Sequence, residues 1–275
     1  NWIRKQTLVN AERYITEELK EYESKILIAE EKIKEIELIE FNKVLAKLIP
    51  HISNLQDIAK IVAYSDCLLS FSETSKAYNY SKPIIDESDN FEVIDGRHPV
   101  IEHTLEESKS YIPNDIRINK TDQQILMITG PNMSGKSAIL RQTALISILA
   151  QMGSFVPAKK LKMGFFDKIF TRVGASDNIS QGESTFMVEM LEAASIVNNL
   201  SNRSLILLDE IGRGTSTYDG ISIAWAITQF VHDHYTKAKT LFATHYHELN
   251  MMCDKFKRVK NFNIQIKETE KDIIF

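Results

Sequence analysis

Residues 130–137 read Gly-Pro-Asn-Met-Ser-Gly-Lys-Ser and fit the phosphate-loop pattern G-x-x-x-x-G-K-[ST] at every fixed position. The apolar run 125–128 before them predicts a buried strand, and residues 138–146 after them predict a helix. This context suits the pattern, because loop N–H groups and a helix N-terminus together hold phosphate oxygens. We therefore expect a nucleoside-triphosphate site, with Lys136 on the β- and γ-phosphates and Ser137 on Mg²⁺. A chance glycine turn is disfavoured, since both flanking elements are present.

Two adjacent acids, Asp209 and Glu210, follow a second short apolar run at residues 204–208, which predicts a central strand of a parallel sheet. At such a strand end, one carboxylate can hold the metal and the next can reach a water aligned with the γ-phosphate. Behind a phosphate loop, the pair favours hydrolysis over binding alone. His245 follows a third run at residues 240–244 and is expected at the same sheet edge, facing the γ-phosphate. A structural histidine is the alternative.

A further polar segment, residues 179–186, leads into a run with helical spacing of its apolar side chains: Phe186, Met190, Ala193 and Val197. This spacing puts Ser184 or Thr185 where a helix N-cap belongs. One interpretation is an ordinary capped helix. The other is a second anion site, made of a serine hydroxyl, a glycine and the helix dipole. Spacing alone does not separate the two.

Several long motifs resemble the ATPase domain of the MutS family of DNA mismatch-recognition proteins: residues 130–137, 170–175, 183–190, 209–220 and 242–246. Residues 2–14 resemble that family's DNA clamp, where it rejoins the long lever helices. The likeness covers almost the whole chain, and the clamp segment favours the branch that recognises mismatches. The sequence departs from the family pattern at Ala138, where threonine is common, which leaves Ser137 available for the metal.

The resemblance implies roles for individual residues. The catalytic set would be Lys136, Asn132, Glu210 and His245, with Asn132 contacting the γ-phosphate and the water, and the metal ligands would be Ser137 and Asp209. The ATP contacts would be Gly130, Pro131, Asn132, Met133, Ser134, Gly135, Lys136, Ser137 and Ala138, together with Tyr111 and Ile112. Tyr111 resembles the aromatic residue that stacks on adenine, although taken alone it is more typical of a core tyrosine. Gly182 and Ser184 match the signature of ABC-type ATPases, which acts on the partner subunit's ATP, and Asp219 belongs to the segment expected at the dimer interface.

Composition and charge limit the class of protein. The chain has 275 residues and a net charge of −4, enough for one sizeable core plus an extended part. No apolar stretch approaches about 20 residues, so no membrane span is predicted, and the lone thiols Cys67 and Cys253 suit a reducing compartment. The acidic balance does not indicate nucleic-acid binding, so we expect DNA contacts mainly from domains outside this sequence. A start without Met and an end within a strand-like run predict a fragment of a larger protein.

The chain divides into two parts. Between residues 7 and 80 there is no glycine, and Pro50 is the one possible breaker. A coiled-coil-like seam is formed by Leu19, Tyr22, Ile26, Ala29, Ile33 and Ile36, and a second stripe by Ile52, Leu55, Ala59 and Val62. Two long helices could therefore pack antiparallel, as a spacer or as a lever. We expect residues 1–82 to be helical, ending the clamp and forming the levers. Residues 83–275 are expected to form an α/β P-loop NTPase domain of the ABC-ATPase type with a mostly parallel sheet, truncated at its C-terminal end.

Together these features predict the Mg²⁺-dependent ATPase part of a mismatch-recognition protein. It would act as a homodimer on mismatched double-stranded DNA, with downstream mismatch-repair proteins, in the cytoplasm and on the nucleoid when DNA-bound, and without a membrane. The alternative is an ABC-type motor of another DNA-associated or chromosome-structural complex. The clamp-like start disfavours that motor and a transporter subunit, and Glu210 disfavours a module that only binds nucleotide.

Overall fold

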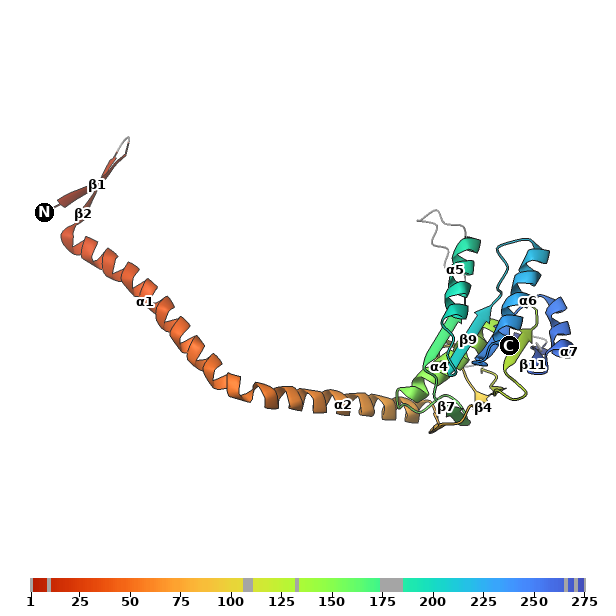
Figure 1. The fold of residues 1–275 in the computed structure, drawn as a ribbon. Helices are drawn as coiled ribbons and strands as arrows, with labels where there is room; N and C mark the ends of the chain where they lie inside the picture. The colour runs from red at the N-terminus through yellow and green to blue at the C-terminus, as the bar shows by residue number, and fades with distance from the viewer. Residues whose placement is uncertain are drawn as a thin grey trace. The chain divides into compact units, whose positions relative to one another are not determined.

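The computed structural model describes residues 2–8, 11–105, 111–131, 134–173, 185–264, 267–269 and 272–274. It forms two compact units, Asn1–Leu68 and Leu69–Phe275, which divide within helix α2 (Figure 1). Helix α2 ends at Ala77, and the first strand of the second unit begins at Ile84. The division between residues 82 and 83 that the sequence predicts falls between the end of α2 and the start of β3. The compact units divide earlier, between Leu68 and Leu69.

The first unit opens on an antiparallel hairpin of β1 (Trp2–Leu8) and β2 (Ala11–Thr16). The prediction of an all-helical segment is therefore wrong at its start. Aromatic and β-branched side chains such as Ile3 and Ile15, which pair across the hairpin, favour strands over helix there. Helix α1 (Glu17–Leu48) begins where the Thr16 side chain accepts a hydrogen bond from the Leu19 N–H at 3.2 Å.

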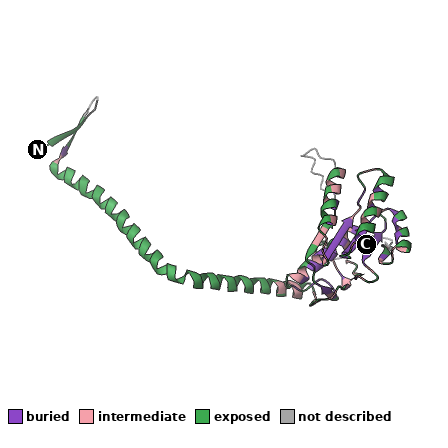
Figure 2. Cartoon of the chain, in the orientation of Figure 1, coloured by how far each residue is buried: buried purple, intermediate pink, exposed green. Residues whose placement is uncertain are grey.

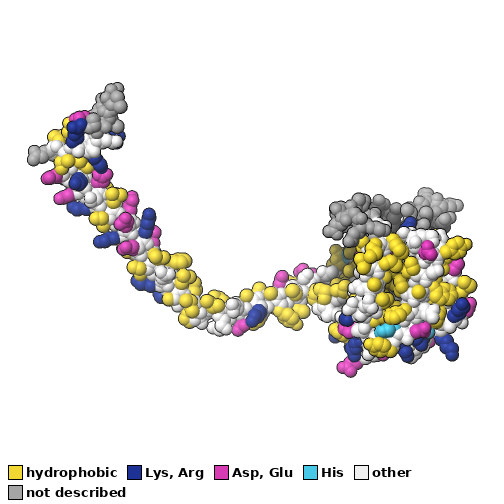
Figure 3. All heavy atoms as spheres, turned by 45° about the horizontal axis from the view of Figure 1, so that its top comes forward, with side chains coloured by type: hydrophobic (Ala, Val, Ile, Leu, Met, Phe, Trp, Pro, Cys, Tyr) yellow, Lys and Arg dark blue, Asp and Glu magenta, His cyan; other side chains and the backbone are white. Residues whose placement is uncertain are grey.

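Helix α1 is followed by the 3₁₀ turn η1 (Ile49–His51) and by α2 (Ile52–Ala77). Every residue from 17 to 70 is exposed, as Figure 2 shows, and the seam residue Ile26 is 60% exposed. The antiparallel helix pair that the sequence suggested is thus absent from the described residues. The reason is local, because Ile49 and Ile52 keep right-handed helical dihedrals around Pro50 and the backbone does not reverse there. Charged side chains of both signs also lie along α1, as Figure 3 shows.

The second unit is built on a five-stranded sheet in the order β11-β6-β10-β9-β8, in which every pair is parallel. Its strands are β6 (Ile125–Thr129), β8 (Lys168–Arg172), β9 (Ser204–Asp209), β10 (Lys239–Ala243) and β11 (Val259–Asn263). All residues of β6 and β10 are buried, which explains the apolar residues 125–128 and 241–243, while Lys239 and Thr240 are buried polar residues at the start of β10.

The two faces of this sheet carry separate cores, because side chains alternate along each strand. Leu126 and Ile128 face one core with helix α4 (Lys136–Gln151), whereas Ile125 and Met127 face the other. Helices α5 (Thr185–Asn198) and α6 (Thr217–Asp233) cover the second face, together with η3 (His247–Met251) and α7 (Met252–Lys255). The sheet is therefore a middle layer that holds its strand ends rigidly.

A smaller mixed sheet, in the order β3-β7-β4-β5, shares the core on the α4 side. Its elements are β3 (Ile84–Asp86), β4 (Phe91–Gly96), β5 (Asn114–Ile118) and β7 (Lys160–Gly164), with the short helix α3 (Ile101–Thr104) between β4 and β5. A last hairpin joins β12 (Lys267–Thr269) and β13 (Asp272–Ile274). The predicted class, an α/β domain with a mostly parallel sheet after a long helical segment, is confirmed. No helix among the described residues is long and apolar enough to cross a membrane.

Candidate nucleotide-binding and catalytic site

The segments that carry the candidate phosphate-binding and catalytic residues lie at one edge of the parallel sheet. Strand β10 lies between β6 and β9, and Ala243 at its end pairs with both Ile128 and Asp209. The phosphate loop follows β6, Glu210 follows β9, and His245 comes two residues after β10. Because parallel strands place their carboxyl ends side by side, these three segments share one edge, where open α/β sheets bind ligands.

The phosphate-loop lysine, Lys136, is buried and forms hydrogen bonds with the backbone of the same loop. Lys136 is 4% exposed, and its Nζ donates hydrogen bonds to the carbonyl oxygens of Gly130 at 2.9 Å and Pro131 at 2.7 Å. Gly135 has φ +88°, a left-handed conformation that favours glycine, and it starts α4 directly before Lys136. A buried cation at a helix N-terminus is suited to anionic oxygen.

Ser134, in the same loop, is 2% exposed, and its Oγ has no hydrogen-bond partner within the described part of the chain. A buried hydroxyl without a partner is rare in native proteins and indicates a site for a polar ligand. Ala138 lies in the first turn of α4. Asn132 and Met133, which the sequence places among the nucleotide contacts, lie outside the described residues.

Asp209 ends β9, and its Oδ1 is a buried oxygen with no hydrogen-bond partner among the described residues. Burial raises the pKa of its carboxyl group, Glu210 adds to this rise, and hydrogen bonding with Ser137 opposes it. A buried carboxylate oxygen beside a hydroxyl fits Mg²⁺, which prefers hard oxygen ligands and usually takes one or two carboxylates plus phosphate oxygens. The described residues hold no group of three or more His, Cys, Asp or Glu that could hold a metal ion.

Glu210 has an unusual backbone and an ion pair. Its φ is +50°, in the left-handed region that non-glycine residues seldom adopt, and its N–H donates to the Ala243 carbonyl oxygen at 2.9 Å. Its carboxylate lies 2.6 Å from Nη1 of Arg213, which is mostly exposed. Sequence reasoning missed Arg213, whose signal was its position three residues after the paired acids. The His245 ring lies beside the Tyr246 ring, with centroids 4.2 Å apart.

Tyr111 lies partly buried before β5, and its hydroxyl donates a hydrogen bond to Oε1 of Gln142 at 2.7 Å. Gln142, on α4, is fully buried, and its Nε2 has no hydrogen-bond partner in the described chain. Burial raises the pKa of Tyr111 to about 12. Tyr111 is therefore only partly exposed, with its hydroxyl anchored to the core residue Gln142. Ile112 is 37% exposed beside it.

The signature residues Gly182 and Ser184 lie outside the described residues, and α5 begins directly after them at Thr185. Asp219 lies in the first turn of α6, where its N–H donates to Ser216 Oγ at 3.3 Å. Asp219 also accepts a hydrogen bond from that hydroxyl at 2.7 Å, so it takes part in the α6 cap.

A parallel sheet with a phosphate loop after one strand and paired acids after another defines a P-loop ATPase domain. Residues 126–275 match the family model for MutS domain V, and residues 1–32 match the model for MutS family domain IV. The chain belongs to the MutS family.

Curated relatives agree over the whole chain. Three proteins named DNA mismatch repair protein MutS are 64%, 63% and 60% identical, from Christiangramia forsetii, Flavobacterium johnsoniae and Phocaeicola vulgatus. Each comparison covers 100% of this chain and 32% of the relative. The chain thus spans about a third of the length of the curated relatives it matches.

Proposed function

We propose that this chain is the ATP-hydrolysing part of a DNA mismatch-repair protein and that its ATPase is Mg²⁺-dependent. One observation carries the proposal. Two buried polar atoms that have no hydrogen-bond partner among the described residues, Ser134 Oγ and Asp209 Oδ1, occur at the sheet edge that also holds Lys136 and Glu210. Burying such atoms costs free energy unless a ligand forms hydrogen bonds with them. A metal-bound triphosphate carries negative oxygens that suit Lys136 and a cation that suits Asp209.

Each residue has a proposed part in hydrolysis. Lys136 exchanges its two loop carbonyls for phosphate oxygens, and Ser137 and Asp209 would hold Mg²⁺, which would supply positive charge to the phosphates when bound. Glu210 takes a proton from the water that attacks the γ-phosphate, with ADP as the leaving group, and its carboxylate, which pairs with Arg213 at 2.6 Å in the structure, turns to the water to do so.

Further residues bind and orient the nucleotide. Asn132 and His245 orient the γ-phosphate and the water, and the backbone of residues 130–138 binds the phosphates through its N–H groups, which all of these residues except Pro131 possess. Tyr111 stacks on adenine beside Ile112. An aromatic face gives sequence-independent contact area to a base, and burial of the Tyr111 hydroxyl at Gln142 fixes the ring's orientation.

The active form is a homodimer in this proposal. Gly182 and Ser184 of one subunit, which precede α5 in the sequence, act on ATP held by the other subunit, with Asp219 near the same interface. The support is physical and family-based, since a helix N-terminus favours an anion and the chain belongs to the MutS family. Downstream mismatch-repair proteins would respond to the closed dimer.

Contacts to mismatched double-stranded DNA come mainly from other parts of the full-length protein. In the first unit, Arg4 pairs with Glu12 at 2.8 Å and Lys5 with Glu23 at 2.6 Å, so much of the local positive charge is neutralised. Unpaired Lys and Arg are what drives binding to the phosphate backbone. The proposed location is the cytoplasm, with the protein on the nucleoid when it is bound to DNA.

A gel-shift titration of the full-length protein on matched and mismatched duplexes tests this function. We expect tighter binding to the mismatch, and ATP should change that affinity in the parent protein but not in Lys136→Ala. Equal binding to both duplexes with normal ATP hydrolysis would favour the alternative, an ABC-type motor of another DNA-associated complex.

A further inference from the structure

The loop after the paired acids is held at one residue, Gly212, from two directions. Its N–H donates a hydrogen bond to Oε1 of Glu189, which lies on α5. Its carbonyl oxygen accepts a hydrogen bond from the Tyr246 hydroxyl at 2.9 Å. Both polar backbone groups of this buried residue are therefore used by side chains of other elements, two positions after Glu210.

There is no spare room around this contact. Gly212 has φ +91°, and a Cβ there would lie 2.7 Å from the Gly220 Cα. A Cβ on Gly220 would lie 2.3 Å from the Tyr246 hydroxyl. Because the loop, the start of α6 and Tyr246 meet at van der Waals distance, the loop cannot shift without breaking one of these contacts.

Glu189 is 6% exposed, which is exceptional for a carboxylate on a helix. A buried acid is costly unless hydrogen bonds satisfy it, and its bond to Gly212 is made to the loop that carries Glu210. Burial raises the pKa of the Tyr246 phenol, and the charge of Glu189 adds to the rise, which agrees with their closeness.

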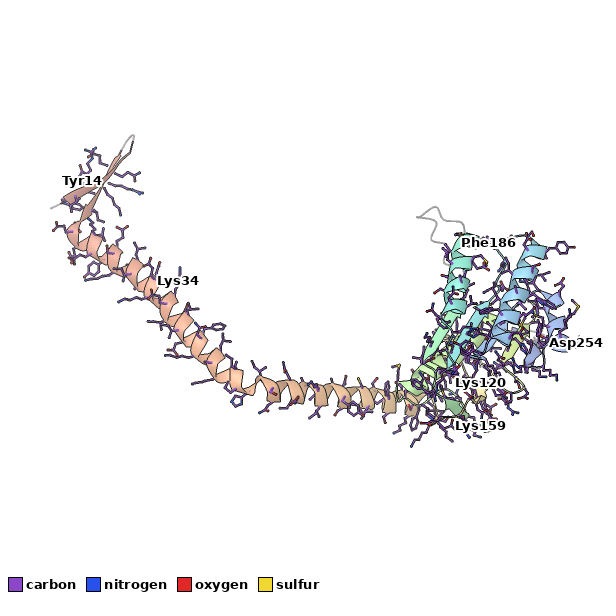
Figure 4. All side chains as sticks on the ribbon, in the orientation of Figure 1. Tyr14, Lys34, Lys120, Lys159, Phe186 and Asp254 are labelled. Carbon is purple, nitrogen blue, oxygen red and sulfur yellow. The ribbon has the colours of Figure 1, made fainter. Side chains whose placement is uncertain are left out.

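Helix α5 meets the loop at a second point. A Cβ on Gly214 would lie 3.3 Å from the Phe186 Cβ, and Figure 4 labels Phe186 at the first turn of α5. The loop therefore contacts α5 through both Phe186 and Glu189. A movement of the N-terminal turns of α5 has to displace the Gly212 N–H or break its bond.

We propose that Glu189 and Tyr246 are positioning residues, which clamp Gly212 and so fix the backbone from which the Glu210 side chain reaches the water. Glu189 also ties Glu210 to α5, so that Glu210 responds to whatever the start of α5 contacts. This inference rests on the proposed function, in which Glu210 is the base. Misplacing a catalytic group by about 1 Å can cost about 10²-fold in rate, so hydrogen bonds that hold the backbone two residues after Glu210 can have a large effect on hydrolysis.

The test measures single-turnover ATP hydrolysis and equilibrium ATP binding in the full-length protein. Glu189→Ala should slow hydrolysis about tenfold to hundredfold while the ATP dissociation constant stays within about twofold. Glu189→Gln should recover most of the rate, because its amide oxygen can still accept from the Gly212 N–H. Tyr246→Phe should slow hydrolysis in the same direction.

Glu192→Ala is the matched control, since Glu192 lies one turn further along α5, is partly exposed and pairs with Arg172 of β8 at 2.8 Å rather than with the Gly212 loop. Its hydrolysis rate should stay at the parental value. If Glu189→Ala does not fold, as judged by its thermal unfolding midpoint, Tyr246→Phe decides the question.

Two results overturn the inference. The first is hydrolysis at the parental rate in folded Glu189→Ala and Tyr246→Phe. The second is a parallel loss of rate and ATP affinity that Glu189→Gln does not reverse, which indicates general damage. Glu210→Gln, measured alongside, separates the two proposals: parental hydrolysis in that variant overturns the proposed function itself, whatever the Glu189 variants show.

Discussion

Tyr111→Phe separates the two roles that meet in this residue. The change keeps the ring, which would stack on adenine, and removes the hydroxyl, which donates to Gln142 Oε1 at 2.7 Å. Gln142 is fully buried, so its oxygen loses its partner in a place that water does not reach. Leaving a buried acceptor unsatisfied costs about 1–3 kcal/mol, so we expect the free energy of unfolding to fall by about 1–2 kcal/mol.

Nucleotide affinity should respond differently. Tyr111→Phe should bind ATP nearly as well as the parent protein, because the aromatic face is unchanged. Tyr111→Ala should lose about 1 kcal/mol or more of binding free energy, the typical contribution of an aromatic pair, and should also be less stable than Tyr111→Phe. Urea-induced unfolding gives the stability, and titration with a fluorescent ATP analogue gives the affinity.

A double-mutant cycle with Gln142→Leu isolates the hydrogen bond. Replacing both partners by apolar groups removes the unsatisfied oxygen, so the double variant should be more stable than the two single losses predict, by about 1 kcal/mol. Two outcomes would refute the reasoning. One is a stability of Tyr111→Phe equal to that of the parent. The other is equal, large losses of stability in Tyr111→Phe and Tyr111→Ala, which would favour a tyrosine with only a core role.

Three further predictions concern charge and assembly. The raised pKa of Asp209 means that more of it is protonated at a given pH than in a free aspartate. Acidification should therefore raise the Mg²⁺ concentration that gives half-maximal hydrolysis, and Asp209→Asn should remove that pH dependence. A half-maximal Mg²⁺ concentration that does not change with pH in the parent protein would contradict this. Burial lowers the pKa of Lys239 from 10.5 to about 8, so the unfolded chain binds more protons in that range and the free energy of unfolding should rise as pH increases through it. Lys239→Met should make the free energy of unfolding less dependent on pH in this range. An equally steep increase in that variant would mean that another group causes the pH dependence. Mixing Ser184→Ala with Lys136→Ala subunits should restore some hydrolysis, since one site in each mixed dimer carries neither lesion; inactive heterodimers would argue against action across the interface.

The phosphate loop and the paired acids could be found from the sequence because each depends on neighbours along the chain. Apolar runs predicted β6, β9 and β10, and the parallel order of these strands then brings the loop, Asp209 and His245 to one edge. Each pattern lies within a short stretch of sequence. The rule that the carboxyl ends of parallel strands share one edge then predicts that the three segments lie together.

Contacts between distant segments could not be found in this way. The bond from Gly212 to Glu189 and the bond from Tyr111 to Gln142 each join residues on separate elements, and a glutamate or glutamine on a helix usually indicates a solvated face. The hairpin at the start of the chain was not predicted, because the glycine-free run that begins at residue 7 favours a continuous helix. The antiparallel helix pair that the sequence suggested is absent from the described residues, because an apolar stripe indicates that a helix needs a partner but not which segment covers it.

The most direct test of the account is single-turnover hydrolysis of ATP by Glu210→Gln in the full-length protein. This change keeps the shape of the side chain and removes the base, so ATP should bind with parental affinity while hydrolysis slows about 10²-fold or more. The variant should therefore hold intact ATP, recoverable after separation from free nucleotide. Hydrolysis at the parental rate would show that the carboxylate acting on water lies elsewhere and would contradict the assignment of this sheet edge as the catalytic site.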